Sequence, residues 1–241
     1  MQKLKILTVC YNSSLFVENL FHSVSFTCGL PFSLHVVDNG SNDNNINILK
    51  KAARKYKATI IHRRQAEVYA PSRHHGEAIH CGLNSFQNDD IAVIIDCDSS
   101  FLKKNWGRDV LRFLDQYDHF TCKRPGVENG CGVWFSAFNV KKVRENNINF
   151  LPRLNPDGTD KKCSDQWDVG SDLIRLSSWK PLVHHPRKKF QPKGHVWMLD
   201  DSVFLDHMGK SRSGTGFVEW KRWLEQQWNL SQHEKYIRIR P

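Results

Sequence analysis

The sequence predicts an α/β fold in which a mostly parallel sheet is flanked by helices, and two observations predict it. Over residues 1–98, short apolar runs rich in β-forming residues alternate with segments whose apolar residues recur at helical spacing. Strands separated by helices imply crossover connections and therefore parallel pairing, with both faces of the sheet covered. The chain of 241 residues is also long enough to bury a sizeable core. A chain of this length fits one large domain or two closely fused halves.

Four strands are expected in this first half, each an apolar run that ends in polar residues. They cover residues 4–10, 33–37, 58–61 and 91–95. Three helices are expected between them. The first follows a capping hydroxyl of Ser13 or Ser14, the second carries Ile46 and Leu49 on its apolar face, and the third covers residues 76–86.

The second half of the chain is less regular. A helix is expected around residues 110–117, a strand over 130–138 after a glycine-rich turn, a loop over 151–162, and a further helix from about Asp168. Near the C-terminus an amphipathic helix has one apolar stripe, formed by Phe217, Trp220, Leu224 and Trp228. We expect this stripe to pack on the core. Contact of Lys221, Arg222 and Trp223 with a membrane surface is the alternative.

Composition limits the partners and the compartment. The net charge of +10 points to an anionic partner, but no nucleic-acid-binding motif accompanies it, so no nucleic acid is expected. No apolar run reaches the roughly 20 residues of a membrane span, and no signal peptide is recognised. The seven cysteines include no C-x-x-C pair. They indicate small core residues in a reducing compartment, which predicts a cytoplasmic protein.

Acidic residues follow two of the expected strands at the point where each strand ends. Asp38 follows the second strand, and Asp96 and Asp98 follow the fourth. Open α/β sheets bind ligands at the carboxyl ends of their strands, so we expect a common binding cleft there. Two carboxylates one residue apart also suit a hard divalent cation, Mn²⁺ or Mg²⁺, that keeps positions open for phosphate oxygens. The alternative is that the pair only caps a buried strand and begins a turn.

Three segments together resemble the nucleotide-binding half of the GT-A glycosyltransferases of family 2. They are TVCYN at residues 8–12, VVDNGSND at 36–43 and DCD at 96–98, in the family's order and at its spacing. A fourth segment, SRHHGEA at 72–78, lies where relatives carry a basic or amide residue before a glycine and a helix. The resemblance implies a GT-A-like, Rossmann-like sheet in a single domain over residues 1–241. Residues 1–98 would form its nucleotide-sugar-binding half, 99–215 its acceptor and catalytic half, and 216–241 a C-terminal helix and tail.

The resemblance implies a role for each matching residue. Asp38 would hydrogen-bond the nucleotide base. Asp98 would bind the metal ion, and Asp96 would contact the ribose, or the metal through water. Arg73 would contact the diphosphate, because a guanidinium suits phosphate oxygens, although a solvated surface arginine is the alternative. The rest of the nucleotide pocket would be lined by residues around the end of the first strand: Thr8, Val9 and Tyr11.

The same resemblance directs attention to a general base and a third metal ligand. Inverting relatives use a carboxylate at the start of a later helix to take the acceptor proton. Residues 164–173 offer Asp165, Asp168 and Asp172 but lack the usual acidic pair. Asp168 is favoured because its Asp-Val-Gly sequence resembles a form that some members carry, and Asp172 is second. A purely capping role is the alternative.

The segment DHMGK at residues 206–210 resembles a late His-x-Gly segment of relatives, which makes His207 the candidate third ligand. The adjacent His74 and His75 have no such support from spacing and are interpreted as surface or packing residues.

The resemblance thus implies a glycosyltransferase. It would move a sugar from a nucleotide-diphosphate-sugar donor to a glycan or other hydroxyl acceptor, by direct displacement with inversion and with Mn²⁺ or Mg²⁺ bound. Two alternatives stay open. A sugar nucleotidyltransferase also uses paired aspartates and a metal, but the glycine-rich loop usual after its first strand is missing from residues 11–14. A non-catalytic carbohydrate- or nucleic-acid-binding module would not need the carboxylates for any reaction.

Overall fold

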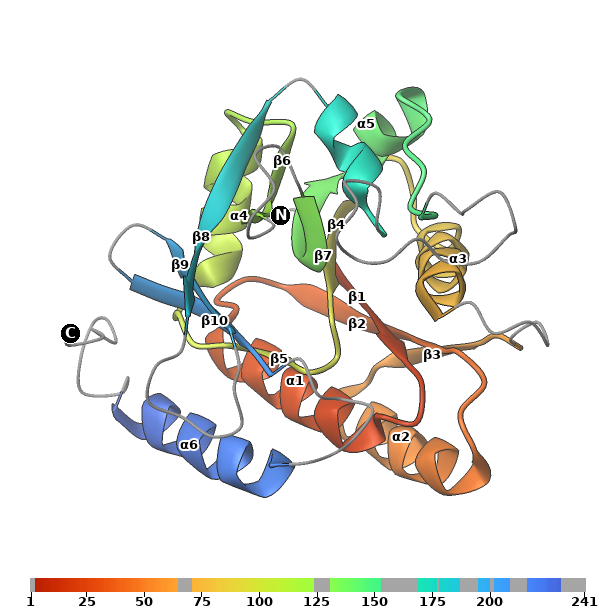
Figure 1. The fold of residues 1–241 in the computed structure, drawn as a ribbon, viewed down its shortest axis with the longest axis vertical. Coiled ribbons are helices and arrows are strands. Elements are labelled where there is room, and N and C mark those ends of the chain that lie inside the picture. Colours follow the sequence, from red (N-terminus) through yellow and green to blue (C-terminus); the bar gives the residue numbers. More distant parts are fainter. Residues whose placement is uncertain are drawn as a thin grey trace.

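The protein has the expected α/β architecture around one large sheet (Figure 1). The computed structural model describes residues 3–64, 71–123, 131–152, 169–176, 178–186, 195–199, 202–208 and 216–230. Within these residues, ten strands form the sheet in the order β3-β2-β1-β4-β7-β6-β8-β9-β10-β5. Four neighbouring strands are parallel: β1 (Leu4–Cys10), β2 (Phe32–Asp38), β3 (Thr59–His62) and β4 (Ile91–Ile95). The predicted fold class is confirmed.

The remaining strands combine both directions. Strand β7 pairs antiparallel with β4 and with β6, while β6 and β8 pair parallel. The last part of the sheet is antiparallel from β8 through β9 and β10 to β5. These strands are β5 (Ser99–Phe101), β6 (His119–Lys123), β7 (Cys131–Asn139), β8 (Trp179–Pro186), β9 (His195–Leu199) and β10 (Ser202–His207).

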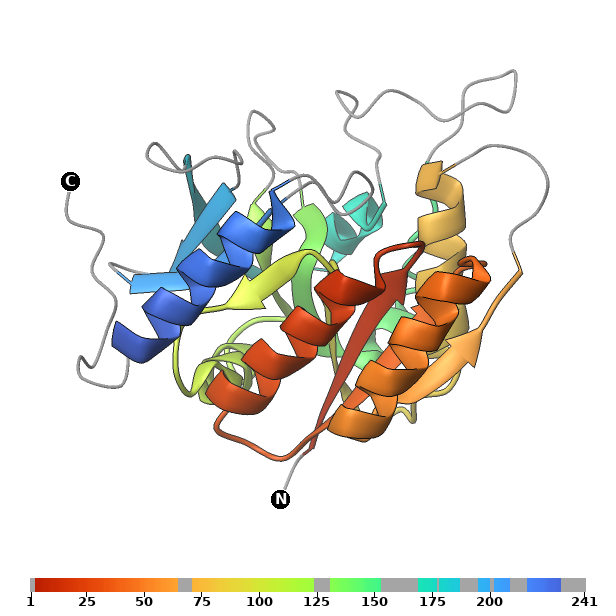
Figure 2. The same cartoon turned by 90° about the horizontal axis from the view of Figure 1, so that it is seen from below.

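Helices cover both faces of the parallel strands. On one face, α1 (Ser14–Thr27), α2 (Asp43–Tyr56) and α6 (Phe217–Leu230) lie side by side (Figure 2), and α3 (Pro71–Leu83) covers the other face. Strand residues alternate between the two cores: Ile6 packs in the core with α1, and its neighbour Leu7 packs in the core with α3. The shorter helices are α4 (Trp106–Leu114), α5 (Val140–Glu145) and the 3₁₀ helix η1 (Ser171–Arg175).

The order of the strands creates a binding position beside β1. The chain adds β2 and β3 on one side of β1 and then crosses to β4 on its other side. Where strand order reverses in this way, the loops at the carboxyl ends diverge and leave a crevice. The loops after β1 and β2 are tied together there. The Asn12 amide donates to Ser41 Oγ at 2.9 Å, and the Asn42 amide donates to Asn12 Oδ1 at 2.9 Å.

Several element boundaries differ from the sequence expectation. Helix α3 begins at Pro71 rather than at residue 76, since proline fits the first turn of a helix. The helix expected from about Asp168 is wrong for the described residues, where η1 is followed by β8. Gly170 precedes η1 with a φ of +75°, and the residues after it extend to pair with β6. The expected loop over 151–162 lies almost wholly outside the described residues.

None of the helices that the structure describes combines the length and the apolar character that a bilayer crossing requires.

Candidate metal and donor site

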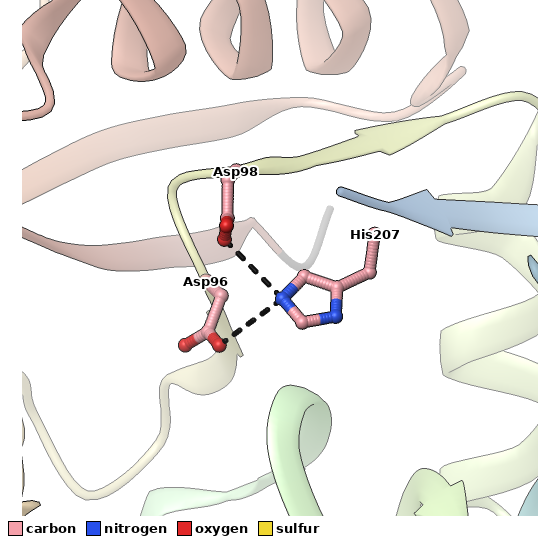
Figure 3. Close-up of side chains that lie close together, drawn as sticks. All are labelled: Asp96, Asp98 and His207. Atoms are coloured by element: carbon pink, nitrogen blue, oxygen red, sulfur yellow. Dashed lines mark ion pairs between the residues drawn. The ribbon is translucent and has the colours of Figure 1, made fainter. Parts of the chain in front are cut away.

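Two carboxylates and one imidazole converge at the carboxyl end of β4 (Figure 3). His207 Nε2 lies 3.2 Å from Asp98 Oδ1 and 3.6 Å from Asp96 Oδ2. One potential ligand atom from each residue lies within 4.8 Å of the others. Asp98 and His207 are nearly buried, at 4% and 6% exposure. The structure therefore brings together the three residues that the sequence singled out as metal ligands.

Short strands hold the three residues in register. Strand β5 begins directly after Asp98 and pairs antiparallel with β10, with Ser99 opposite His207. The Met208 amide donates to the Asp98 carbonyl at 2.8 Å. On the other side, the Asp96 amide donates to the carbonyl of Trp134 at 3.3 Å. Backbone pairing alone thus places one histidine from a distant strand against both aspartates.

The carboxylates determine the ionisation of His207. Burial by itself would lower the pKa of the imidazole, but the negative charges of Asp98, Asp96 and Asp206 outweigh it and raise the pKa. The positive charge of the protonated ring then offsets two carboxylates that would otherwise repel one another. A divalent cation would offset them in the same way, and carboxylate oxygens with one imidazole nitrogen form a suitable set of ligands for it.

His75 of α3 is a second histidine at this cluster. Its Nε2 lies 3.7 Å from Asp96 Oδ1, so Asp96 lies between His75 and His207. The sequence-based interpretation of the histidine pair as surface or packing residues holds for His74, which is buried, but misses the close approach of His75 to Asp96. The only signal in the sequence was its position directly before Gly76.

The residues expected to bind the nucleotide lie along the carboxyl ends of β1 and β2. Asp38 is buried, its Oδ1 accepts from the Ser41 amide at 3.1 Å, and its Oδ2 lies 3.4 Å from His62 Nδ1. Thr8 is also buried, and its hydroxyl has no hydrogen-bond partner among the described residues. Val9 is half-buried, and Tyr11 is 42% exposed. Their roles in binding a base stay predictions.

Arg73 lies two residues before His75 on the exposed side of α3. Its Nε donates to Glu77 Oε1 at 2.9 Å, across one helical turn, and Glu77 also pairs with Arg63. Arg63 in turn donates to Asn39 Oδ1 at 2.6 Å, which connects this network to the loop after β2. Contact of Arg73 with a diphosphate stays a prediction.

The candidate bases differ in what the structure describes of them. Asp172 Oδ2 accepts from the Asn149 amide at 2.8 Å and pairs with Arg175 at 3.1 Å, so its carboxylate already binds two groups. Asp165 and Asp168 lie outside the described residues. The described chain resumes just after them, and there a Cβ on Gly170 would come within 2.3 Å of Val133. This segment is therefore packed closely against β7, next to Trp134.

Comparison with known proteins gives one family and one fold. The profile described as glycosyl transferase family 2 matches residues 5–167. A search of curated proteins found no match. Among solved structures, the mannosyltransferase PcManGT from Pyrobaculum calidifontis, in complex with GDP-Man and Mn²⁺, is 16% identical with a TM-score of 0.51. That alignment covers 64% of this chain and 49% of that one.

Two structures of S. aureus TarS are also similar, both at 16% identity. The fragment 1-349 in complex with UDP-GlcNAc has a TM-score of 0.53, over 94% of this chain and 66% of that one. The longer TarS structure has a TM-score of 0.54, over 94% and 39%. At these identities the likeness concerns the fold. The chain corresponds to between 39% and 66% of the length of these structures.

Proposed function

The chain belongs to glycosyl transferase family 2, and from this premise we propose that it transfers a hexosyl or related sugar from a nucleotide-diphosphate-sugar donor to an acceptor hydroxyl. The proposal rests on one observation, the convergence of Asp96, Asp98 and His207 at the carboxyl edge of the sheet. This cluster lies beside the crevice where α/β sheets bind nucleotides. Transfer proceeds with inversion at the anomeric carbon.

Asp98 and His207 would hold a divalent ion, with Asp96 as a further ligand or a ribose contact, and the imidazole nitrogen would favour Mn²⁺ over Mg²⁺. When bound, it supplies Lewis-acid stabilisation of the charge that develops on the leaving diphosphate. His75 holds the Asp96 carboxylate from its other side. The presence of Mn²⁺ in the PcManGT complex supports this choice of ion.

The donor nucleotide lies across the ends of β1 and β2. Asp38 accepts a hydrogen bond from the base, and Thr8, Val9 and Tyr11 line its pocket. The unpaired, buried hydroxyl of Thr8 supports a ligand there, since buried polar groups are rarely left without a partner. Arg73 reaches the diphosphate. The complexes of TarS with UDP-GlcNAc and of PcManGT with GDP-Man support a nucleotide sugar as the class of donor.

Asp168 acts as the general base. It takes the proton from the acceptor hydroxyl while that oxygen bonds to the anomeric carbon, and the bond from this carbon to the diphosphate breaks. The packing of Gly170 on Val133 supports this assignment, because it keeps the chain after Asp168 close to Trp134 and therefore to Asp96. Asp172 is the weaker candidate, since its carboxylate already binds Asn149 and Arg175.

The direct test is a panel of nucleotide sugars with and without Mn²⁺, followed by calorimetry for binding and by product analysis for transfer and hydrolysis. Binding that requires the metal, with release of the nucleoside diphosphate, is expected. If no nucleotide diphosphate binds in the presence of Mn²⁺, the proposal fails. Release of pyrophosphate from a nucleoside triphosphate and a sugar phosphate would instead indicate a nucleotidyltransferase.

We also expect the protein to work in the cytoplasm. Cys10, Cys28 and Cys81 carry no disulfide, which supports a reducing compartment.

A further inference from the structure

Trp134 of β7 lies directly beside the candidate metal site, although nothing in the sequence singled it out. Its carbonyl accepts the Asp96 amide, so its backbone is fixed at the end of β4. The centroid of its indole lies 6.1 Å from the His207 ring. The ring of Trp197 lies 5.5 Å away, at an interplanar angle of 20°. Trp134 therefore contacts both a candidate metal ligand and a second tryptophan.

The two tryptophans differ in exposure. Trp197 is buried, at 1% exposure, and its ring stacks on that of Trp134. The residues flanking Trp134, Val133 and Phe135, are buried as well, whereas Trp134 keeps part of its surface open. An indole stacked on a buried, nearly parallel ring has a fixed orientation, so the part of Trp134 that stays accessible forms a rigid apolar platform. A core residue would not need to leave such a surface uncovered at the end of a sheet that binds ligands.

We propose that Trp134 is the platform on which the apolar face of a sugar ring stacks during transfer, and this inference rests on the proposed function. A pyranose ring carries hydroxyls around its rim and C–H groups on its face, so it pairs an apolar surface with polar edges. Aromatic rings that fix orientation beside a few placed polar groups are typical of small-molecule sites. A sugar on Trp134 lies beside His207 and Asp96, where the proposed function places the diphosphate. The shared chemistry is a pyranose face, and it belongs either to the donor or to the acceptor.

Three variants separate a stacking role from a structural one. Trp134→Ala removes the platform, and Trp134→Phe keeps a smaller aromatic face. Trp179→Ala is the matched control, because Trp179 is also half-buried and stacks on a histidine, His119, at 5.8 Å. Trp179 lies at the opposite end of the sheet. His119 pairs with both Trp179 and Phe138, and Phe138 pairs with Ala92 near the start of β4.

Binding is measured by calorimetry with Mn²⁺ present, using UDP-GlcNAc, GDP-mannose, UDP and GDP as probes. Transfer is measured with p-nitrophenyl glycosides of glucose, galactose and N-acetylglucosamine as acceptors. If the donor sugar stacks on Trp134, Trp134→Ala weakens binding of the sugar nucleotide roughly 2- to 10-fold and leaves UDP or GDP unchanged. If the acceptor stacks there, donor binding is unchanged and the acceptor KM rises by a similar factor. Trp134→Phe retains most of either effect, and Trp179→Ala changes neither.

Two results overturn the inference while leaving the proposed function intact. One is a folded, active Trp134→Ala protein with unchanged donor affinity and acceptor KM. The other is an equal loss of affinity for the sugar nucleotide and for the nucleotide alone, which would indicate a structural role. If the wild-type protein binds no nucleotide sugar, the proposed function itself fails, and the inference fails with it.

Discussion

His207 and His119 are buried histidines of the same sheet, but they lie at opposite ends of it and in opposite environments. His207 faces Asp96 and Asp98 at the carboxyl end of β4, and their charges raise its pKa despite burial. His119 begins β6 and stacks on Trp179, and burial lowers its pKa to about 4 although the nearby Asp118 opposes the shift. Burial alone thus makes a histidine less basic. The raised pKa of His207 reflects the carboxylates that lie close together, and repel one another, at this end of the sheet. Such perturbed pKa values are common at functional sites.

The largest effect is expected from the proposed general base, and two variants separate the two candidates. Asp168→Asn should lower kcat by about 10²- to 10⁴-fold and leave the Kd of the donor unchanged, because an amide cannot accept the acceptor proton. Asp172→Asn should instead lower the melting temperature, since Asn149 and Arg175 lose a charged partner, and should change kcat only slightly. Single-turnover kinetics and calorimetry on both variants provide the measurements. Loss of donor binding in Asp168→Asn would contradict the assigned role.

The second prediction compares one aspartate from each end of the sheet. Asp98→Asn should weaken Mn²⁺ binding by more than about 100-fold with little change in the stability of the metal-free protein. Asp118→Asn is the matched control at the amino end, where the carboxylate binds Lys142 and accepts from the Ser178 amide at 3.1 Å. It should cost roughly 1–3 kcal/mol of unfolding free energy and leave Mn²⁺ affinity unchanged. Equal losses of Mn²⁺ affinity in both variants would contradict the prediction that metal binding depends on the carboxyl end of the sheet and not on the amino end.

The third prediction concerns stability in acid. The folded pKa of His119 is about 4, below the usual 6.5, so the unfolded chain takes up the proton first. The contribution of neutral His119 to the free energy of unfolding is fully present above about pH 6.5. It is lost as the pH falls towards 4, and about 2 kcal/mol is lost at pH 5. His35, whose pKa burial and Lys5 also lower to about 4, adds a separate loss of the same sign. Urea unfolding above pH 6.5 and at pH 5 should therefore show that His119→Phe loses less unfolding free energy between these conditions than the wild-type protein does. An unchanged loss in that variant would mean that His119 is already protonated when folded.

The smallest effect is the pH dependence of metal binding at His207. The imidazole must be neutral to bind a metal, so Mn²⁺ displaces a proton at any pH below its raised pKa. Mn²⁺ affinity should rise about tenfold per pH unit up to that pKa and then level off. Calorimetry in buffers of different ionisation enthalpy measures the released proton directly. His207→Ala should bind Mn²⁺ more weakly and release no such proton, and a wild-type affinity independent of pH would exclude His207 as a ligand.

The parallel half of the fold could be predicted because its sequence signals are local. Strand β4 is buried on both faces and is a continuous apolar run, and the mostly buried β1 is interrupted only by Lys5 and Thr8; both strands end abruptly in polar residues. The later strands lack that signal. Strand β8 contains Pro181 and Pro186, and β5 has only three residues, Ser99–Phe101. Such strands form because neighbouring chain segments pair with them. Their own sequences contain no pattern that predicts a strand.

The same limit applies to the candidate site. Asp96 and Asp98 follow a strand that could be predicted, and the family resemblance supplied His207. His75 and Trp134 reach the cluster only through tertiary packing: one lies on a helix that crosses the opposite face, and the other lies on an antiparallel strand. Asp172 was ranked second on the family resemblance, whereas its contacts with Asn149 and Arg175 depend on how the folded chain packs.

Strand β10 carries consecutive residues with different attachments. His207 points to Asp96 and Asp98, whereas Asp206, on the other face of the strand, accepts the indole N–H of Trp220 in α6 at 2.6 Å. The contact with the C-terminal helix and the candidate metal ligand therefore lie on neighbouring residues of the same strand, β10. Anything that pulls α6 away, whether cleavage before residue 216 or a competing partner, would let the strand shift and loosen His207 without touching the metal site. Loss of Mn²⁺ affinity after removal of α6 would show that a helix far along the chain from the two aspartates influences metal binding.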